Sequence, residues 1–213
     1  MALRPIARMG AEVLKDRAAE IGDFTDPALG TLIDDMVETM FAANGVGLAA
    51  PQIFAPYRVV VFFVPAARNN GVEVPLTVMI NPEINPTGPD KHSDWEACLS
   101  VPGLTGMVPR WTHIRYSWQD IRGHRHEREA TDFHARVVQH ECDHLDGKLY
   151  PMQMTDLTTL SYVETLKAEA MARGEELDID EEGEPVAAHS LGSGDGSTAV
   201  DITRGDVEAD RQS

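Results

Sequence analysis

The sequence has little cysteine and no long hydrophobic run. Two of its 213 residues are cysteines, Cys98 and Cys142, which is too few for a framework of disulfides. In a reducing compartment, this scarcity favours a catalytic or metal-binding role for at least one of them. The longest apolar run lies around Val59–Val64, far below the roughly 18 residues that a membrane span needs. We therefore expect no membrane segment.

The N-terminus also lacks the features of a secretory signal peptide. Positive charge is present within Met1–Pro5, but no apolar stretch of signal-peptide length follows it. We expect the protein to be cytoplasmic.

Positive charge is scarce in the sequence as a whole. There are 18 Lys and Arg against 35 Asp and Glu, and the net charge is −17. A nucleic-acid-binding surface should be basic, so no direct nucleic-acid binding is expected. The imbalance is greatest in residues 174–213, which contain twelve acidic and two basic side chains. This segment is rich in Gly, Ser, Asp and Glu and cannot bury enough surface to offset its chain entropy. The sequence predicts a folded domain over 1–173 and an acidic, disordered tail over 174–213.

Hydrophobic periodicity and cap residues predict the secondary structure. Asp26 is a good N-cap and Pro27 suits a first helical turn, while Thr155 or Asp156 can cap a later helix. Three helices are expected at about 27–43, 131–146 and 157–173. Strands are expected at 58–64, 76–80, 113–121 and 126–130, with 122–124 as a hairpin turn.

The strongest chemical signal is the run from His140 to His144, an HExxH pattern inside the second predicted helix. An α-helix turns about 100° per residue, so the two histidines lie about 40° apart on one face. Two imidazoles placed in this way can chelate one metal ion. Glu141 lies about 100° round from His140, where it suits a general base acting on water better than a ligand. Cys142 lies about 200° round and is predicted to pack away from the metal.

A mononuclear catalytic metal site needs a third protein ligand and an open position. A third histidine six residues after the second would indicate a metzincin protease, but that position is Tyr150. Glu164 lies at a distance that suits a thermolysin-like protease, although its surroundings are typical of an ordinary amphipathic helix. Cys98 is the third candidate, because its soft thiolate would complete a Cys-His-His site.

Three motifs, in this order, resemble those of the peptide deformylases: GVGLAAPQ at 45–52, EACLS at 96–100 as a version of EGCLS, and QHECDHLDG at 139–147. The resemblance covers roughly residues 5–155 and makes 1–173 the catalytic domain. It implies an α+β fold, with antiparallel β-sheets packed around a central HExxH-bearing helix and with N-terminal and C-terminal helices. The family has Gly where this chain has Ala97. If that backbone needs a positive φ, the methyl group would cost on the order of 1 kcal/mol.

The resemblance implies that Cys98, His140 and His144 hold one divalent metal ion. The family preference is for Fe(II), and Zn(II), Ni(II) or Co(II) also suit the site. A thiolate ligand leaves the metal less electron-poor than three histidines would, which favours an ion that expands its coordination easily. Glu96 resembles a carboxylate that pairs with Arg110 in the shell around the metal site.

The implied reaction is hydrolysis of the N-formyl group at the formyl-methionine of a new polypeptide, with release of formate. Glu141 is expected to take a proton from water and pass it to the departing amine. Gln52 and the backbone N–H of Leu99 are expected to stabilise the developing negative charge. Val46 and Gly47 resemble the strand edge that pairs with the substrate backbone.

The methionine side chain needs an apolar pocket, for which Phe133 and Val137 are the predicted walls. Plain core packing is the alternative for both. Arg136 is expected near the rim or in solvent. The expected partners are formyl-methionyl nascent peptides, with transient contact to the ribosome from which they emerge.

Two other functions stay open at the level of sequence. A metalloprotease that cleaves internal peptide bonds would have Glu164 on the metal in place of Cys98. A non-catalytic binding relative is disfavoured, because a degenerate copy should have lost at least one of the expected ligands or catalytic side chains, and all of them are intact.

Overall fold

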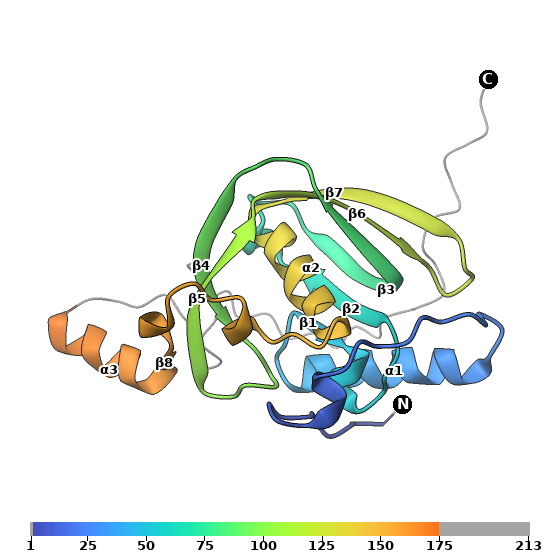
Figure 1. Cartoon of the computed structure of the whole chain (residues 1–213), viewed down its shortest axis with the longest axis horizontal. Helices are drawn as coiled ribbons and strands as arrows, with labels where there is room; N and C mark the ends of the chain where they lie inside the picture. Colours follow the sequence, from blue (N-terminus) through green and yellow to red (C-terminus); the bar gives the residue numbers. More distant parts are fainter. Residues whose placement is uncertain (1, 175–213) are drawn as a thin grey trace, which may run out of the picture.

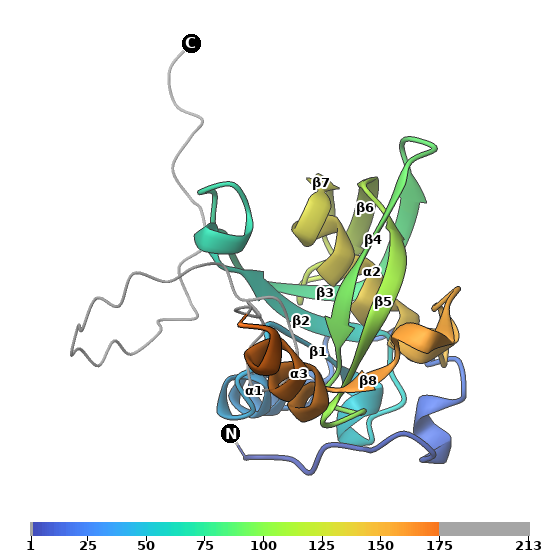
Figure 2. The same ribbon diagram turned by 90° about the vertical axis from the view of Figure 1, so that its left-hand side faces the viewer.

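The computed structural model describes residues 2–174, which form two antiparallel β-sheets with a helix between them (Figure 1, Figure 2). The larger sheet has the order β1-β2-β3-β6-β7, with strands β1 (Gly47–Ala49), β2 (Val59–Val64), β3 (Val74–Pro86), β6 (His113–Gln119) and β7 (Arg125–Thr131). The smaller sheet has the order β4-β5-β8, with strands β4 (Lys91–Ala97), β5 (Leu104–Trp111) and β8 (Ser161–Tyr162). The three α-helices are α1 (Pro27–Ala42), α2 (Asp132–Leu145) and α3 (Val163–Arg173). The predicted α+β fold is confirmed.

Strand β2 shows why the larger sheet is buried on both faces. Successive side chains of a strand point to opposite faces. Val60 and Phe62 accordingly join the core against α2, whereas Val59 and Val61 join the core against α1. A strand covered on both sides needs a continuous apolar run, and VVVFFV supplies it. This packing fixes α2 on the sheet and so fixes the histidines that it carries.

Helix α1 begins as the sequence predicts. The Asp26 side chain accepts a hydrogen bond from the backbone N–H of Ala28, and Pro27 occupies the first turn. Its buried face is formed chiefly by Leu29, Ile33, Met36 and Met40. Phe41 has the i+1 spacing from Met40 that takes it off this face, and it remains 47% exposed.

The β4–β5 hairpin was not predicted, and it supplies one wall of the site. Strand β4 is mostly polar in sequence, and β5 contains both Gly106 and Pro109, which ordinarily argue against a strand. Pro109 is tolerated because β8 pairs only with Leu104 and Thr105, so that among residues 2–174 no strand pairs with this edge of β5 at Pro109. Ala97 has an ordinary strand conformation opposite Thr105 and does not have a positive φ, so the extra methyl group causes no backbone strain.

The C-terminal helix begins later than predicted. Asp156 does act as a cap, since its side chain accepts a hydrogen bond from the backbone N–H of Thr158. It caps only a single 3-10 turn, Leu157–Thr159, which is followed by β8 before α3 starts at Val163. The predicted disorder of 174–213 concerns residues that, apart from Gly174, lie outside the described part of the chain. Within residues 2–174, no helix is both long and apolar enough to cross a membrane.

Candidate active site

The HExxH histidines lie on α2 as the helix geometry requires. The rings of His140 and His144 are one turn apart, with centroids 5.0 Å from each other. Cys98, directly after β4, brings its Sγ to 3.4 Å from His144 Nε2. One ligand atom from each of these three residues lies within 4.8 Å of the others, and all three side chains are buried. Within residues 2–174, no other group of three or more His, Cys, Asp or Glu side chains converges in this way.

The imidazole of His140 is oriented by a buried carboxylate. His140 Nδ1 lies 2.9 Å from Glu96 Oε2, so the Nδ1–H donates to Glu96 and Nε2 is left for the metal-binding side. Arg110 binds the same carboxylate through two hydrogen bonds, from Nε to Oε1 at 2.8 Å and from Nη2 to Oε2 at 2.9 Å. The predicted pairing of Glu96 with Arg110 is confirmed.

The charges around these groups favour a cation. Burial alone would raise the pKa of Glu96, but the Arg110 charge and the hydrogen bonds from Arg110 and His140 hold it well below its usual range. Burial opposes charge on His140, yet hydrogen bonds to Cys98 and Glu96 and their negative charges raise its pKa well above the ordinary value. Burial, followed by the neighbouring positive charge of His140, lowers the pKa of His144, which favours the neutral imidazole that a metal ligand requires.

Hydrogen-bond donors converge on the sulfur of Cys98. The backbone N–H of Ser100 lies 3.4 Å from Sγ, and Gln52 Nε2 lies 3.6 Å from it. The Gln52 amide is held in this orientation because its Oε1 accepts a hydrogen bond from the backbone N–H of Ala49 at 2.8 Å. A thiolate with two imidazoles is a donor set suited to Fe(II) or Zn(II). The residues therefore fit a divalent metal ion.

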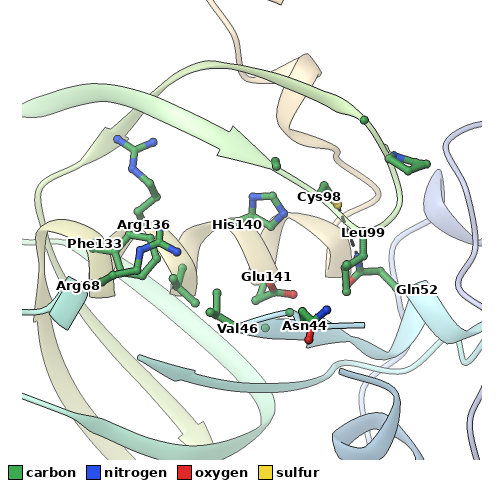
Figure 3. Close-up of a pocket in the computed structure, with 16 residues that line it drawn as sticks. Asn44, Val46, Gln52, Arg68, Cys98, Leu99, Phe133, Arg136, His140 and Glu141 are labelled. Atoms are coloured by element: carbon green, nitrogen blue, oxygen red, sulfur yellow. Dashed lines mark hydrogen bonds between the residues drawn. The ribbon is translucent and has the colours of Figure 1, made fainter. Parts of the chain in front are cut away.

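A cavity of about 300 Å³ opens beside these ligands (Figure 3). Nine of the ten predicted site residues line it: Val46, Gly47, Gln52, Cys98, Leu99, Phe133, Val137, His140 and Glu141. The tenth, His144, does not line the cavity and lies behind it against Cys98 Sγ. Cys98, Leu99 and Gln52 lie toward one end of the cavity, and Phe133 lies toward the other end together with the side chains of Arg68 and Arg136 (Figure 3).

Gly47 lies directly against the predicted general base. A Cβ atom added to Gly47 would overlap the carboxylate of Glu141, so any larger residue would displace that carboxylate. Gly47 belongs to β1, the edge strand of the larger sheet, and Ala97 belongs to β4, the edge strand of the smaller sheet. The cavity is thus bordered by two strand edges, either of which can pair with an extended peptide.

Two arginines line the cavity that sequence reasoning did not place there. Arg136 is 6% exposed, so the expectation that it lies near the rim or in solvent is wrong. Its position four residues before His140 gives the signal that was missed, since residues four apart share one helix face. Arg68, in the 3-10 turn Ala66–Arg68, places its guanidinium carbon 3.6 Å from the centroid of the Phe133 ring. No local motif indicates that contact, because Arg68 lies in the β2–β3 connection and Phe133 lies at the start of α2, far away in the sequence.

Neither the alternative ligand nor the second cysteine belongs to the cluster of metal-binding atoms. Glu164 is exposed in the first turn of α3 and does not join the ligand cluster. Cys142 packs in the core between α2 and the larger sheet, as predicted, and burial raises the pKa of its thiol. The geometry therefore favours Cys98 over Glu164 as the third ligand.

Comparison with known proteins identifies the family. The family model of polypeptide deformylase matches residues 3–159. The chain belongs to this family. Peptide deformylase 1 of Bordetella pertussis is 51% identical over 168 residues, which cover 77% of this chain and 94% of that protein. Peptide deformylase 1 of Nitrosomonas europaea is 46% identical over 166 residues, which cover 77% of this chain and 94% of that protein.

Solved structures of the family have the same fold. A class I type b peptide deformylase from Acinetobacter baumannii aligns with a TM-score of 0.67 at 34% identity, over 72% of this chain and all of that chain. The peptide deformylase of Thermotoga maritima aligns with a TM-score of 0.66 at 35% identity, over 73% of this chain and all of that chain. Polypeptide deformylases are metal-dependent hydrolases that remove the N-formyl group from nascent polypeptides. The activity implied by the three sequence motifs is thereby confirmed.

Proposed function

We propose that the cavity beside α2 is the deformylation site and that Cys98, His140 and His144 hold the metal. The single observation that carries the proposal is the convergence of these three buried ligand atoms within 4.8 Å, with Glu141 lining the same cavity. A divalent ion bound there would supply Lewis acidity, which polarises a carbonyl group and lowers the pKa of water.

The proton transfers are assigned to Glu141. Its carboxylate accepts a proton from the attacking water and delivers it to the departing amine, which leaves formate and a free N-terminus. Gln52 Nε2 and the backbone N–H of Leu99 donate to the oxygen of the formyl group as negative charge develops there. Gln52 suits this role because the bond from Ala49 keeps Nε2 directed toward Cys98. Within residues 2–174, the N–H of Leu99 makes no hydrogen bond, so it is available to the substrate.

The substrate is a formyl-methionyl peptide held in an extended conformation. Gly47 at the open edge of β1, with Val46 directly before it, faces the substrate backbone, and the edge of β4 borders the other side. Val137 and Phe133 form the apolar walls that receive the methionine side chain. The relative from Acinetobacter baumannii is described in complex with Met-Ala-Ser, a peptide of the kind that deformylation would leave.

The test compares the two cysteines of the chain. We expect the purified protein to release formate from formyl-Met-Ala-Ser and to contain about one metal ion per chain. Cys98→Ala should lose both the metal and the activity. Cys142→Ala is the matched control, since its sulfur packs in the core, and it should retain both. Retention of metal and turnover by Cys98→Ala would refute the proposed ligand set.

We propose Fe(II) as the native ion, with Zn(II), Ni(II) and Co(II) as ions that the same donors accept. A thiolate beside a redox-active metal is exposed to oxidation. Protein purified in air should therefore lose activity, and protein loaded with Ni(II) should keep it. Equal activity in air and under anaerobic conditions, with iron shown to be bound, would contradict the choice of Fe(II).

We also propose that the protein acts in the cytoplasm. Residues 1–173 are its catalytic domain, and 174–213 are dispensable for catalysis. The family match ends at residue 159, and 174–213 contribute a net charge of −10. Like charges repel across a Debye length of about 8 Å, so an acidic segment should weaken any encounter with ribosomal RNA. A chain ending at 173 should deformylate a short peptide at the parent rate and bind ribosomes equally or more strongly at low salt. Loss of most peptide activity in a truncated protein that folds would contradict this division.

A further inference from the structure

Arg136 connects the helix that carries the histidines to the hairpin that leads to Cys98. Its side chain is buried on α2, one turn before His140. Nη1 donates to Glu96 Oε1 at 2.7 Å and to the backbone carbonyl of Val108 at 2.8 Å. Nη2 donates to the backbone carbonyl of His92 at 2.8 Å. One guanidinium thus spans α2, β4 and β5.

A second guanidinium is not needed to provide hydrogen bonds to both oxygens of Glu96. Arg110 already binds both oxygens of that carboxylate and also pairs with Asp143 at 2.5 Å. Burying a further charge costs free energy unless it is fully hydrogen-bonded. The buried position of Arg136 therefore needs a reason other than satisfying Glu96. That reason lies in which of the two Glu96 oxygens Arg136 binds.

The two oxygens of Glu96 have different hydrogen-bond partners. Oε2 accepts from Arg110 and faces Nδ1 of His140, whereas Oε1 accepts from Arg110 and Arg136. Without Arg136, Oε1 would keep only its hydrogen bond from Arg110, and the orientation of the carboxylate toward His140 would depend on that one guanidinium. With Arg136 in place, Oε1 is bound from two directions, and Oε2 is kept on His140.

We propose that Arg136 is a positioning residue for the metal site, which acts through Glu96 to hold His140 and which fixes the Cys98-bearing hairpin at its distance from α2. This inference rests on the proposed ligand set and adds to it a residue that touches neither metal nor ligand. The carboxylate partner of a metal-binding histidine orients the ring, and loss of such outer partners typically lowers metal affinity about 10–100-fold.

The experiment measures metal release from the full chain loaded with Co(II), whose absorption reports on thiolate ligation. Arg136→Leu should speed the loss of Co(II) to a chelator about 10-fold or more and change the Co(II) spectrum. Arg136→Lys keeps one charged donor group and should give an intermediate rate, and it serves where the leucine variant does not fold. Arg115→Leu is the matched control, because Arg115 pairs with Glu129 on the exposed hairpin and should release Co(II) at the parent rate.

A double-mutant cycle separates positioning from general stability. If Arg136 acts through Glu96, then Arg136→Leu should accelerate release much less in a Glu96→Gln background than in the parent. Equal effects in the two backgrounds, or a lowered melting temperature with unchanged Co(II) release and spectrum, would overturn the proposal. These readouts do not involve formate, so failure of the parent to deformylate peptides would contradict the proposed function without deciding the role of Arg136.

Discussion

The two faces of α2 are both buried but are held by different interactions. Eleven of its fourteen residues are buried, so neither face is a solvent face. Toward the larger sheet, Val138, Cys142 and Leu145 pack into an apolar core. Toward the β4–β5 hairpin, Arg136 and His140 make short polar contacts with a single carboxylate. The sheet-facing side of α2 therefore contributes to the core, and its hairpin-facing side holds the residues of the site.

This difference shows which interactions determine the orientation of individual side chains on α2. Apolar packing is non-directional, so the sheet-facing side fixes the position of α2 but not the rotation of any single side chain. Hydrogen bonds between charged groups are short and directional, so the hairpin-facing side fixes ring orientation. Substitutions on the sheet-facing side should change the free energy of unfolding, and those on the hairpin-facing side should change metal binding or turnover.

The largest expected effect is on the polar side. Glu141→Gln is nearly isosteric but cannot accept a proton, so turnover on a formyl-Met peptide should fall about 10²–10⁴-fold. Metal content should remain at the parent value. Glu164→Gln on exposed α3 is the control and should leave turnover unchanged. Turnover of the Glu141 variant near the parent value would assign the general base elsewhere.

The next largest effect tests the close approach of β1 to α2. In Gly47→Ala, the added methyl group would meet the Glu141 carboxylate, and a displacement of about 1 Å at a reacting group can cost about 10²-fold in rate. We expect turnover to fall by that order with the metal retained. Gly30→Ala, where the added methyl meets nothing within 4 Å, is the matched control and should keep full activity. A Gly47→Ala variant with parent turnover would show that β1 can shift enough to accommodate the methyl group without displacing Glu141.

The sequence predicts the structure most accurately where a local period determines it. The HExxH motif predicted α2 and the facing histidines, because a regular helix converts spacing directly into geometry. It failed at β4–β5, where polar residues, Gly106 and Pro109 hide two strands whose pairing is decided by distant parts of the chain. The general rule that arginine is exposed then misplaced Arg136. Its buried position depends on Glu96 and on carbonyl groups of that unpredicted hairpin.

On the apolar face, Val138→Ala should change stability and leave chemistry intact. Val138 is fully buried against the larger sheet, and loss of its methyl groups should lower the free energy of unfolding by about 1–3 kcal/mol. Urea denaturation measures this loss, and turnover per folded molecule should match the parent. Val72→Ala is the matched control, since Val72 is 64% exposed and should change stability by less than about 0.5 kcal/mol. A large loss of turnover in folded Val138→Ala would remove the distinction between the faces.

The smallest expected effect concerns His134, a polar residue within the apolar side of α2. Its Nε2 lies 3.0 Å from the Tyr116 hydroxyl, which donates to the neutral ring, and burial together with the Arg128 charge lowers the pKa of His134 to about 4. An ordinary histidine in the unfolded chain takes up a proton near pH 6.5. Between about pH 6.5 and pH 4 the unfolded chain therefore binds more protons at this position, so stability falls as the pH falls.

Above about pH 6.5 the group is neutral in both states and contributes no pH dependence. After allowance for solvent screening, His134 should account for about 1–2 kcal/mol of the stability lost by pH 4. His134→Gln retains an acceptor for Tyr116 without a titrating ring, so its stability should fall less steeply over this window. The control is His113→Gln at an exposed position, which should follow the parent curve. Identical curves for His134→Gln and the parent would mean that the apolar face accepts a charge as readily as the polar face does.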